Sequence, residues 1–302
     1  MTQQSENLPS SLAPRALLFG ATGAIGKSVC QRLLDKGWQV IAISRQPGVS
    51  AQTGVEWRAG TLPDIALGND HFDAIISCGP SDLFAQWFVQ GFAHSEIQAS
   101  RVVAFGSTSV HVKQSSPDQS ERELAQRLRQ AETQLETAAA QKNIAITLLR
   151  PTLVYGSGMD KNISRIAHIA RRYGFFVLPR DATGLRQPVH VDDLADAALV
   201  AVERTEKGMR SYDLPGGETL SYREMTKRIL HGLQPPARLL ILPGVLFRLV
   251  AKIARLLGMH DAGEAVLARM REHLVFDDSA ARTDLRYNPR PFKLDIKMFN
   301  VK

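Results

Sequence analysis

Short apolar runs alternate with amphipathic stretches from about residue 15 to residue 150. The runs are almost continuous in apolar and β-branched residues, which is typical of parallel strands buried on both faces. The stretches between them, such as 28–36 and 119–141, have helical periodicity and predict crossover helices. This alternation predicts an α/β fold with a doubly wound parallel sheet. We predict its strands at residues 16–19, 39–44, 55–58, 74–78, 102–105 and 144–149.

The second half of the chain has a less regular pattern. Helical periodicity returns at residues 162–172 and 192–203, with loops between. We therefore expect part of this half to return to the sheet and the rest to form a small C-terminal lobe for a substrate. The predicted division is a flexible tail over 1–14, a core over 15–160, and these mixed segments with the lobe over 161–302.

The composition is that of a folded globular protein. Of the 302 residues, 44% are hydrophobic and 22% are charged, which excludes wholesale disorder and a multi-span membrane protein. The net charge is +7, but the basic residues are scattered, so we predict small anionic ligands and no nucleic-acid partner. Residues 1–14 lack the features of a secretion signal and the chain has two cysteines, so we expect a cytoplasmic protein.

One basic segment leaves two interpretations open. Residues 245–257 place Arg248, Lys252 and Arg255 on one helical face, opposite a broad apolar face. A basic amphipathic helix of this kind can lie on a membrane surface as a peripheral contact. The second and commoner arrangement is a helix packed on the lobe with its charges in solvent.

Three glycines mark the turn after the first predicted strand. The sequence Gly20-Ala21-Thr22-Gly23-Ala24-Ile25-Gly26 follows that strand and opens the first helix. Glycines there let the backbone approach a pyrophosphate closely, and the helix N-terminus attracts its charge. An ordinary glycine-rich turn is the alternative, but the βαβ context favours a dinucleotide site of the Rossmann type in the core. We predict cofactor contacts from Gly20, Thr22, Gly23, Ala24, Ile25 and Gly26.

This turn and several later motifs resemble the extended epimerase/dehydratase branch of the short-chain dehydrogenase/reductase superfamily. The resemblance spans most of the chain, and it rests on the order and spacing of the motifs together. It implies a Rossmann fold and a bound dinucleotide. The later motifs are Ser107-Thr108-Ser109-Val110, Arg150-Pro151, Tyr155-Gly156-Ser157-Gly158, Arg186 ahead of His190-Val191-Asp192-Asp193-Leu194-Ala195, and Tyr212-Asp213-Leu214-Pro215-Gly216-Gly217.

The end of the second predicted strand bears on the choice of dinucleotide. NAD-binding proteins usually place an acidic residue there, on the ribose 2′-hydroxyl. This chain has Ser44-Arg45 instead. A guanidinium and a hydroxyl suit a 2′-phosphate, so we predict NADP(H), with NAD as the other option. The alternative for Arg45 is a solvated loop residue.

Two further loops are expected to line the cofactor. Thr61 and Leu62 stand near the adenine, where the family often has an aspartate. Cys78, Gly79 and Pro80 end the fourth predicted strand, at the rim where the nicotinamide ribose should lie. We expect Cys78 to be a small packing residue and not a nucleophile, because the sequence shows no evident base as its partner.

The catalytic set of the superfamily is only partly present. The resemblance implies a serine or threonine, and a tyrosine and lysine spaced as Y-x-x-x-K, which move a proton to or from the substrate oxygen. Ser107 matches the hydroxyl position, but none of the five tyrosines has a lysine four residues later. With Glu132 aligned to the acidic residue that often follows the motif, the tyrosine and lysine positions hold Leu124 and Leu128. Leucine cannot transfer a proton.

His111 is the candidate for a relocated acid. It stands four residues after Ser107, where family members often carry tyrosine, and imidazole can gain or lose a proton near neutrality. The alternative is an ordinary surface histidine. The leucines continue at helical spacing to Leu135, which predicts a face buried on a sheet or on the partner in a homodimer. Three functions stay open: a reductase or epimerase with a relocated acid, a nucleotide-binding sensor, and a structural subunit.

The motifs of the second half bear on the substrate. The resemblance implies a nucleotide-sugar-like or other carbonyl compound, with Arg186 at the position of a diphosphate clamp. The alternative for this arginine is an ion pair with Asp192 or Asp193 that fastens the lobe. We expect His190 and Asp193 to be structural, at the start of the next helix, and we assign no metal ligand. The residues predicted to contact the substrate are Tyr155, Lys161, Asn162 and Arg186.

Overall fold

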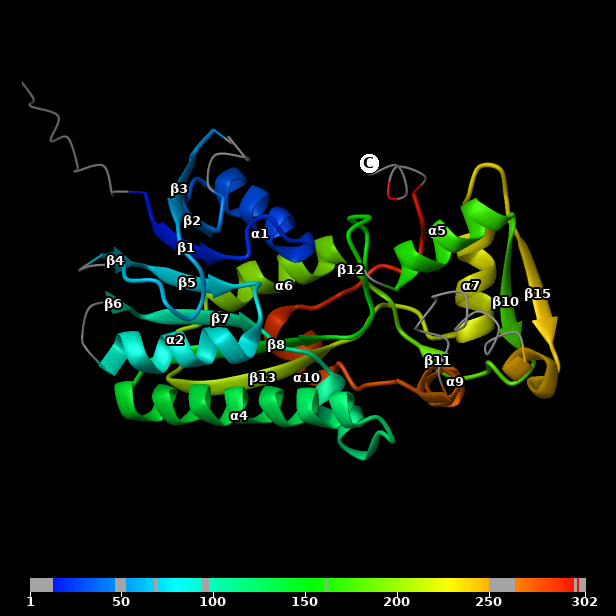
Figure 1. Cartoon of the computed structure of the whole chain (residues 1–302). Helices are drawn as coiled ribbons and strands as arrows, with labels where there is room; N and C mark the ends of the chain where they lie inside the picture. Colours follow the sequence, from blue (N-terminus) through cyan, green and yellow to red (C-terminus); the bar gives the residue numbers. More distant parts are fainter. Residues whose placement is uncertain are drawn as a thin grey trace, which may run out of the picture.

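A parallel sheet of seven strands forms the centre of the molecule (Figure 1). The computed structural model describes residues 13–46, 53–67, 70–93, 98–160, 162–249, 264–295 and 298. The strand order is β13-β8-β7-β5-β1-β2-β3. The strands are β1 (Arg15–Phe19), β2 (Gln39–Ser44), β3 (Val55–Ala59), β5 (Ala74–Ser77), β7 (Arg101–Phe105), β8 (Ala145–Pro151) and β13 (Gly208–Leu214).

Both faces of this sheet are buried, as its apolar strands predict. Along β1, Ala16 and Leu18 belong to one hydrophobic core, and Leu17 and Phe19 belong to the other. The first core is closed by helices α1 (Ala24–Asp35), α6 (Val191–Val202) and α10 (Ser279–Leu285). The second is closed by α2 (Ser81–Ala93) and α4 (Gln119–Lys142) (Figure 1). The predicted doubly wound α/β fold is confirmed.

The six predicted strands are all present, each within two residues of its expected bounds. The seventh, β13, was not predicted, and its residues fall within the mixed segments of 161–302. It pairs in parallel with β8 at the edge of the sheet. Several of its side chains are exposed there, so its sequence lacks the continuous apolar run of the inner strands.

Helix α4 buries most of its leucine stripe within the chain. Leu128 and Leu135 are buried and Leu124 is half-buried. The helix packs along α2 and over β8 and β13. The stripe is therefore largely explained by packing inside one chain, and a homodimer stays a prediction.

The lobe lies beyond the carboxyl ends of the sheet strands (Figure 1). Its core joins α5 and α7 through side chains such as Ile166 and Ile229, together with Phe292 from the end of the chain. One face of the β10–β15 pair packs against both helices. The elements of the lobe are α5 (Ile163–Tyr173), β10 (Phe175–Pro179), β11 (Leu185–Arg186), β14 (Leu220–Ser221), α7 (Tyr222–His231), β15 (Arg238–Leu242) and α9 (Glu264–Arg271).

Short elements connect the sheet with the lobe and complete the fold. β9 (Val154–Tyr155) pairs with β12 (Val189–His190), directly before α6. The segment after α10 returns past this junction, where the Arg290 guanidinium binds the carboxylate of Asp193 at 2.8 Å. The remaining elements are β4 (His71–Phe72), β6 (Gln98–Ala99), α3 (Ser109–Val112) and the 3-10 helix η2 (Lys113–Ser115).

Candidate active site

The turn between β1 and α1 can be built only with glycine at two of its positions. Gly20 has a φ of 74°, and an added Cβ would lie 2.9 Å from the main-chain carbon of Cys78. A Cβ on Gly26 would overlap the carbonyl oxygen of Gly20. The main chain of the turn therefore approaches the end of β5 more closely than any side chain allows.

The N-terminus of α1 is open to an anion. Its first residue follows Gly23, which offers no side-chain cap, and the first turn contains no acidic residue. The positive end of the helix and its first main-chain N–H groups are thus not neutralised locally. Ala24 and Ile25 lie in this first turn and Thr22 is exposed beside it. A pyrophosphate fits this cradle, so the observed turn suits the predicted dinucleotide.

The ends of β2 and β3 meet at the same edge of the sheet. The Gly60 amide donates to the carbonyl of Ser44 at 3.1 Å, which holds the loop of Thr61 and Leu62 beside the end of β2. Arg45 is exposed at this edge. The hydroxyl of Ser44 accepts a hydrogen bond from the Gln46 amide at 3.2 Å. The residues from Ser44 to Gln46 include no acid that would favour a ribose 2′-hydroxyl.

The Cys78-Gly79-Pro80 segment lies against the glycine turn. The Cys78 amide donates to the Phe19 carbonyl at 2.9 Å, and a Cβ on Gly79 would lie 3.6 Å from Leu62. The structure thus brings together three of the predicted cofactor loops. The Cys78 side chain packs on the first core, and burial raises the pKa of its thiol. A thiol that resists ionisation is a poor nucleophile, which supports the packing role predicted for Cys78.

His111 is paired with an acid that lies far away in the sequence. Its Nε2 is 3.2 Å from Oδ1 of Asp213, at the end of β13. The imidazole lies on the short helix α3, is 41% exposed, and has the ring of Phe276 at a centroid distance of 6.1 Å. A half-exposed histidine held by a carboxylate has the arrangement of an oriented acid–base group.

A charged network holds Asp213 in place. Arg150, near the end of β8, donates two hydrogen bonds to the carboxylate of Glu132, at 2.8 and 2.7 Å. The same guanidinium lies 3.6 Å from Oδ1 of Asp213. The pKa of Arg150 is raised by these acids in spite of the opposing effect of its burial. The network keeps a positive charge beside the carboxylate that pairs with His111.

Ser107 lies at the start of the same turn. Its hydroxyl donates to the hydroxyl of Ser109 at 3.0 Å and accepts from the Ser109 amide at 3.1 Å. The turn leads directly into α3, which carries His111. The two predicted catalytic residues are therefore held by one local structure at the carboxyl edge of the sheet.

Sequence reasoning assigned no role to Asp213 or Arg150, although both stand in motifs that it noted. The contacts that reveal them join residues far apart in the chain. Asp213 follows His111 by 102 positions. Only the placement of β13 next to β8 brings Asp213 and Arg150 into register.

The predicted substrate residues are not part of this network. Tyr155 is buried, stacks edge-on with His190 and Phe292, and has a phenol pKa raised by burial. Asn162 is exposed just before α5, and Lys161 lies outside the described residues. This arrangement disfavours a substrate contact for Tyr155, while that of Asn162 stays a prediction.

Arg186 is buried among main-chain carbonyls. Its guanidinium donates to the carbonyls of Leu185 and Glu272, each at 2.7 Å, and to that of Arg269. It also lies over the Tyr222 ring. These bonds join the end of α9 and the residue after it to β11, and they leave few N–H groups of the guanidinium free for a diphosphate.

The alternative ion pair predicted for Arg186 is wrong. Asp192 instead accepts a hydrogen bond from Ser28 at 2.9 Å and pairs with Arg32, which ties α6 to α1. Asp193 pairs with the guanidinium of Arg290. His190 has the structural role expected, since its Nδ1 accepts from the Asp192 amide at the start of α6.

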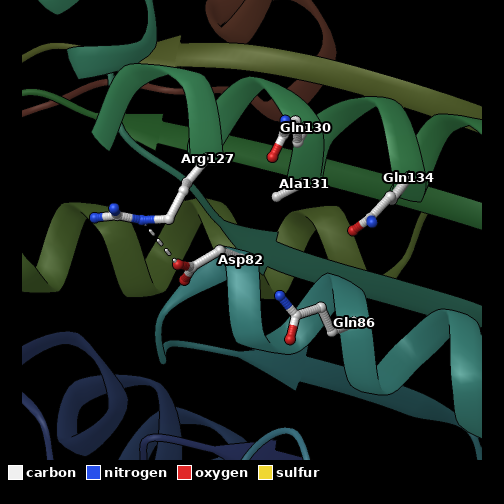
Figure 2. A pocket seen from close by; sticks show the side chains of 6 residues that line it. All are labelled: Asp82, Gln86, Arg127, Gln130, Ala131 and Gln134. Atoms are coloured by element: carbon white, nitrogen blue, oxygen red, sulfur yellow. Dashed lines mark ion pairs between the residues drawn. The ribbon is translucent and has the colours of Figure 1, made fainter. Parts of the chain in front are cut away.

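A groove between α2 and α4 is lined by polar side chains (Figure 2). Asp82 and Arg127 form an ion pair of 3.5 Å across it. Four of its six lining residues are exposed, so it lacks the enclosed apolar walls of a small-molecule site. The lining residues are Asp82, Gln86, Arg127, Gln130, Ala131 and Gln134.

Comparison with known proteins agrees with this architecture. UDP-glucose 4-epimerase from Vibrio cholerae is 20% identical, over 96% of this chain and 94% of that protein. The 2-alkyl-3-oxoalkanoate reductase of Stenotrophomonas maltophilia is 25% identical, over 74% of this chain and 76% of that protein. The UDP-glucuronic acid 4-epimerase of Bacillus cereus, solved with UDP-glucuronic acid and NAD, shares the fold. Its TM-score is 0.69 at 16% identity, covering 92% of this chain and 95% of that one.

A family model covers residues 16–90 and 92–214, which include the glycine turn, Ser107, His111 and Asp213. The chain belongs to the NAD dependent epimerase/dehydratase family.

Proposed function

We propose that this chain is a dinucleotide-dependent oxidoreductase in which Ser107 and His111 replace the missing tyrosine–lysine relay. The observation that carries the proposal is the His111–Asp213 pair of 3.2 Å, beside the Ser107 turn at the carboxyl edge of the sheet. Ligands of open α/β sheets bind at this edge. The pair supplies a proton-transfer group that Leu124 and Leu128 cannot supply.

Each residue has a defined task in this reaction. A dinucleotide held at the glycine turn would supply a hydride to a carbonyl carbon or accept one from a secondary alcohol. When the Ser107 hydroxyl rotates away from Ser109, it donates a hydrogen bond to the substrate oxygen, on which negative charge develops during reduction. With Nε2–H of His111 directed at Asp213, the proton on Nδ1 passes to that oxygen. Asp213 stabilises the imidazolium, and the guanidinium of Arg150, 3.6 Å away, helps to hold the Asp213 carboxylate in place.

The substrate we propose is a small carbonyl or hydroxyl compound, of which a nucleotide-sugar is one class. An epimerase and a reductase that use a dinucleotide share one step, hydride transfer at a carbon that bears oxygen. Both activities occur among the relatives named above. We place the reaction in the cytoplasm, in keeping with two cysteines, Cys30 and Cys78, that form no disulfide.

A second candidate is a nucleotide-binding sensor or structural subunit. The replacement of both relay positions by Leu124 and Leu128 favours it, because the helix that carries catalysis in the superfamily then serves only packing. The two candidates predict the same cofactor site and differ in turnover.

Turnover is the test that separates them. We expect NADPH oxidation with at least one member of a panel of ketones, aldehydes and keto nucleotide-sugars. Ser107→Ala should lower kcat by about a hundredfold, since one oriented donor is lost. The fall in absorbance at the nicotinamide band measures NADPH oxidation by the unmodified protein and kcat of the Ser107→Ala variant. Tight NADPH binding without turnover of any panel member would establish the sensor or structural candidate instead.

The cofactor we propose is NADP(H). Arg45 is exposed at the end of β2 with no acid beside it in the chain, and a 2′-phosphate can bind its guanidinium. NADPH should therefore bind at least about tenfold more tightly than NADH, which needs about 1.4 kcal/mol from charged hydrogen bonds. Calorimetry with both cofactors measures the ratio. Arg45→Ala should remove the preference for NADPH and leave the NADH affinity unchanged. Equal affinities of the unmodified protein for NADPH and NADH would refute the proposed preference.

A further inference from the structure

The outer end of the lobe carries an apolar sheet face that no described element covers. Strands β10 and β15 pair in parallel, so Phe175, Arg238 and Leu240 point to one side of the pair. Phe176 and Leu239 point to the other side and pack in the lobe core. On the outer side, Phe175 and Leu240 are about two-fifths exposed. A strand pair this apolar on both faces is expected to be covered on both.

The apolar surface continues beyond the strands. Residues 244–249 are helical and directly follow β15. Val245 is 75% exposed, Leu246 45% and Leu249 55%, so in its described part this helix turns apolar side chains to solvent. Phe247 on the same helix is partly buried, so one side of residues 245–249 is packed while these three apolar side chains face solvent. Residues 250–257 lie outside the described ranges.

Exposed apolar side chains are concentrated at this end. Seven of the ten large hydrophobic side chains that are exposed in the described part of the chain lie on α5, the two strands or this helix. We call the set of segments that carry them the lobe tip; Figure 1 shows β10 and β15 at the end of the lobe that is farthest from the sheet. The exposed side chains assigned to the lobe tip are Tyr173, Phe175, Leu240, Val245, Leu246 and Leu249; Ile241 pairs with Leu178 and points to the other side of the strands, with Leu239.

The positive charge of the molecule gathers in the same segments. Residues 161–180 and 225–260 contain 11 lysines and arginines and no aspartate or glutamate. The rest of the chain has 26 basic and 30 acidic residues, so these two segments account for the whole net charge of +7. Within the described ranges, Arg172, Arg238 and Arg248 at the lobe tip form no ion pair with an acidic side chain. Arg172 lies over the Tyr173 ring.

We infer that the lobe tip docks on the surface of an anionic membrane. Apolar side chains enter the interface between headgroups and acyl chains, and arginines around them bind the lipid phosphates. The contact is peripheral, because no helix in the described ranges has the length and hydrophobicity to cross a bilayer. A second copy is a poor occupant of this surface, since a two-fold contact would oppose two equally basic faces. The inference does not depend on the proposed reaction.

Sedimentation with vesicles tests it directly. We expect the full chain to sediment with equimolar phosphatidylcholine and phosphatidylglycerol vesicles, and at least about tenfold more weakly with phosphatidylcholine alone. High salt should weaken the anionic binding, because it screens the arginines. These two measurements need no substitution. A protein that stays in the supernatant with anionic vesicles at low salt would overturn the inference.

Matched variants locate the surface. The double substitution Val245→Glu with Leu249→Glu should weaken vesicle binding by more than about tenfold, because two apolar side chains no longer enter the interface. Arg172→Glu should weaken it by about fivefold or more. The controls are Val89→Glu on α2 and Arg129→Glu on α4, which are exposed elsewhere and should bind as the unmodified protein does.

Two results would show that the lobe tip is not the membrane contact. One is vesicle binding that is unchanged in the double variant. The other is a dimer, measured by light scattering, that the double substitution dissociates, which would make a second copy the occupant. Melting curves check that each variant is folded. If the double variant does not fold, the dependence of the unmodified protein on lipid charge and salt still decides between membrane and no membrane.

Discussion

Gly23→Val should abolish dinucleotide binding while the protein stays folded. Gly23 has a φ of −77°, which valine adopts, and an added Cβ would lie 3.2 Å from the nearest atom, the Gly20 carbonyl oxygen. The larger side chain would occupy the cradle at the N-terminus of α1, where we place the pyrophosphate. We expect NADPH affinity to fall by more than about a hundredfold. A fall of this size corresponds to the loss of about two charged hydrogen bonds to the pyrophosphate. Calorimetry measures the affinity, and circular dichroism follows the melting.

Gly26→Val is the contrasting variant. Its Cβ would overlap the Gly20 carbonyl oxygen, so the turn cannot keep its shape and both folding and binding should suffer. Overpacking of this kind costs about 1–3 kcal/mol or more. Gly232→Ala is the control, because the space at this position accepts a methyl group at ordinary contact distance. NADPH binding of normal affinity by folded Gly23→Val would show that the cofactor lies elsewhere.

The glycine turn was predictable from sequence because it is local. A strand, a turn and a helix that are consecutive in the chain fix the positions of Gly20 and Gly26, and their spacing carries the signal. The inner strands were predictable for a similar reason, since burial on both faces leaves a continuous apolar run. β13 lacks that run because it lies at the sheet edge, where part of its surface is exposed.

Contacts between distant segments could not be read in this way. Arg186 stands at the expected spacing before α6, yet its guanidinium is held by carbonyls more than 80 residues further along the chain. The apolar patterns of β10 and β15 indicate burial on both faces, and only their pairing shows that one face is left uncovered. Spacing identified candidate residues, but the partners of those residues depend on the tertiary fold.

Loss of His111 should remove activity without weakening cofactor binding. His111→Phe keeps a flat ring on α3 but has no nitrogen to move a proton, so kcat should fall by about a hundredfold or more. NADPH affinity should stay unchanged, since the imidazole is bound to Asp213 and not to the glycine turn. Assays of NADPH oxidation measure kcat, and calorimetry measures the NADPH affinity.

Asp213→Asn tests the partner of His111 as a positioning residue. An asparagine of the same size can still accept from Nε2, but it brings no negative charge to stabilise the imidazolium, and Arg150 loses one of its two acids. We expect kcat to fall by about ten- to a hundredfold with little change in KM, as loss of a charged hydrogen bond gives. Asp213→Glu should restore part of the rate, which a merely structural loss would not allow.

Leu128→Ala is the matched contrast for these two variants. The side chain is buried in α4, at the position that alignment on Glu132 assigns to the lysine of the superfamily, and its truncation should cost about 2–5 kcal/mol of stability. The folded fraction should turn over at the normal rate, because leucine moves no proton. Full activity in His111→Phe would remove the imidazole from the mechanism. A Leu128→Ala protein that is stable but inactive would instead place the proton transfer on α4.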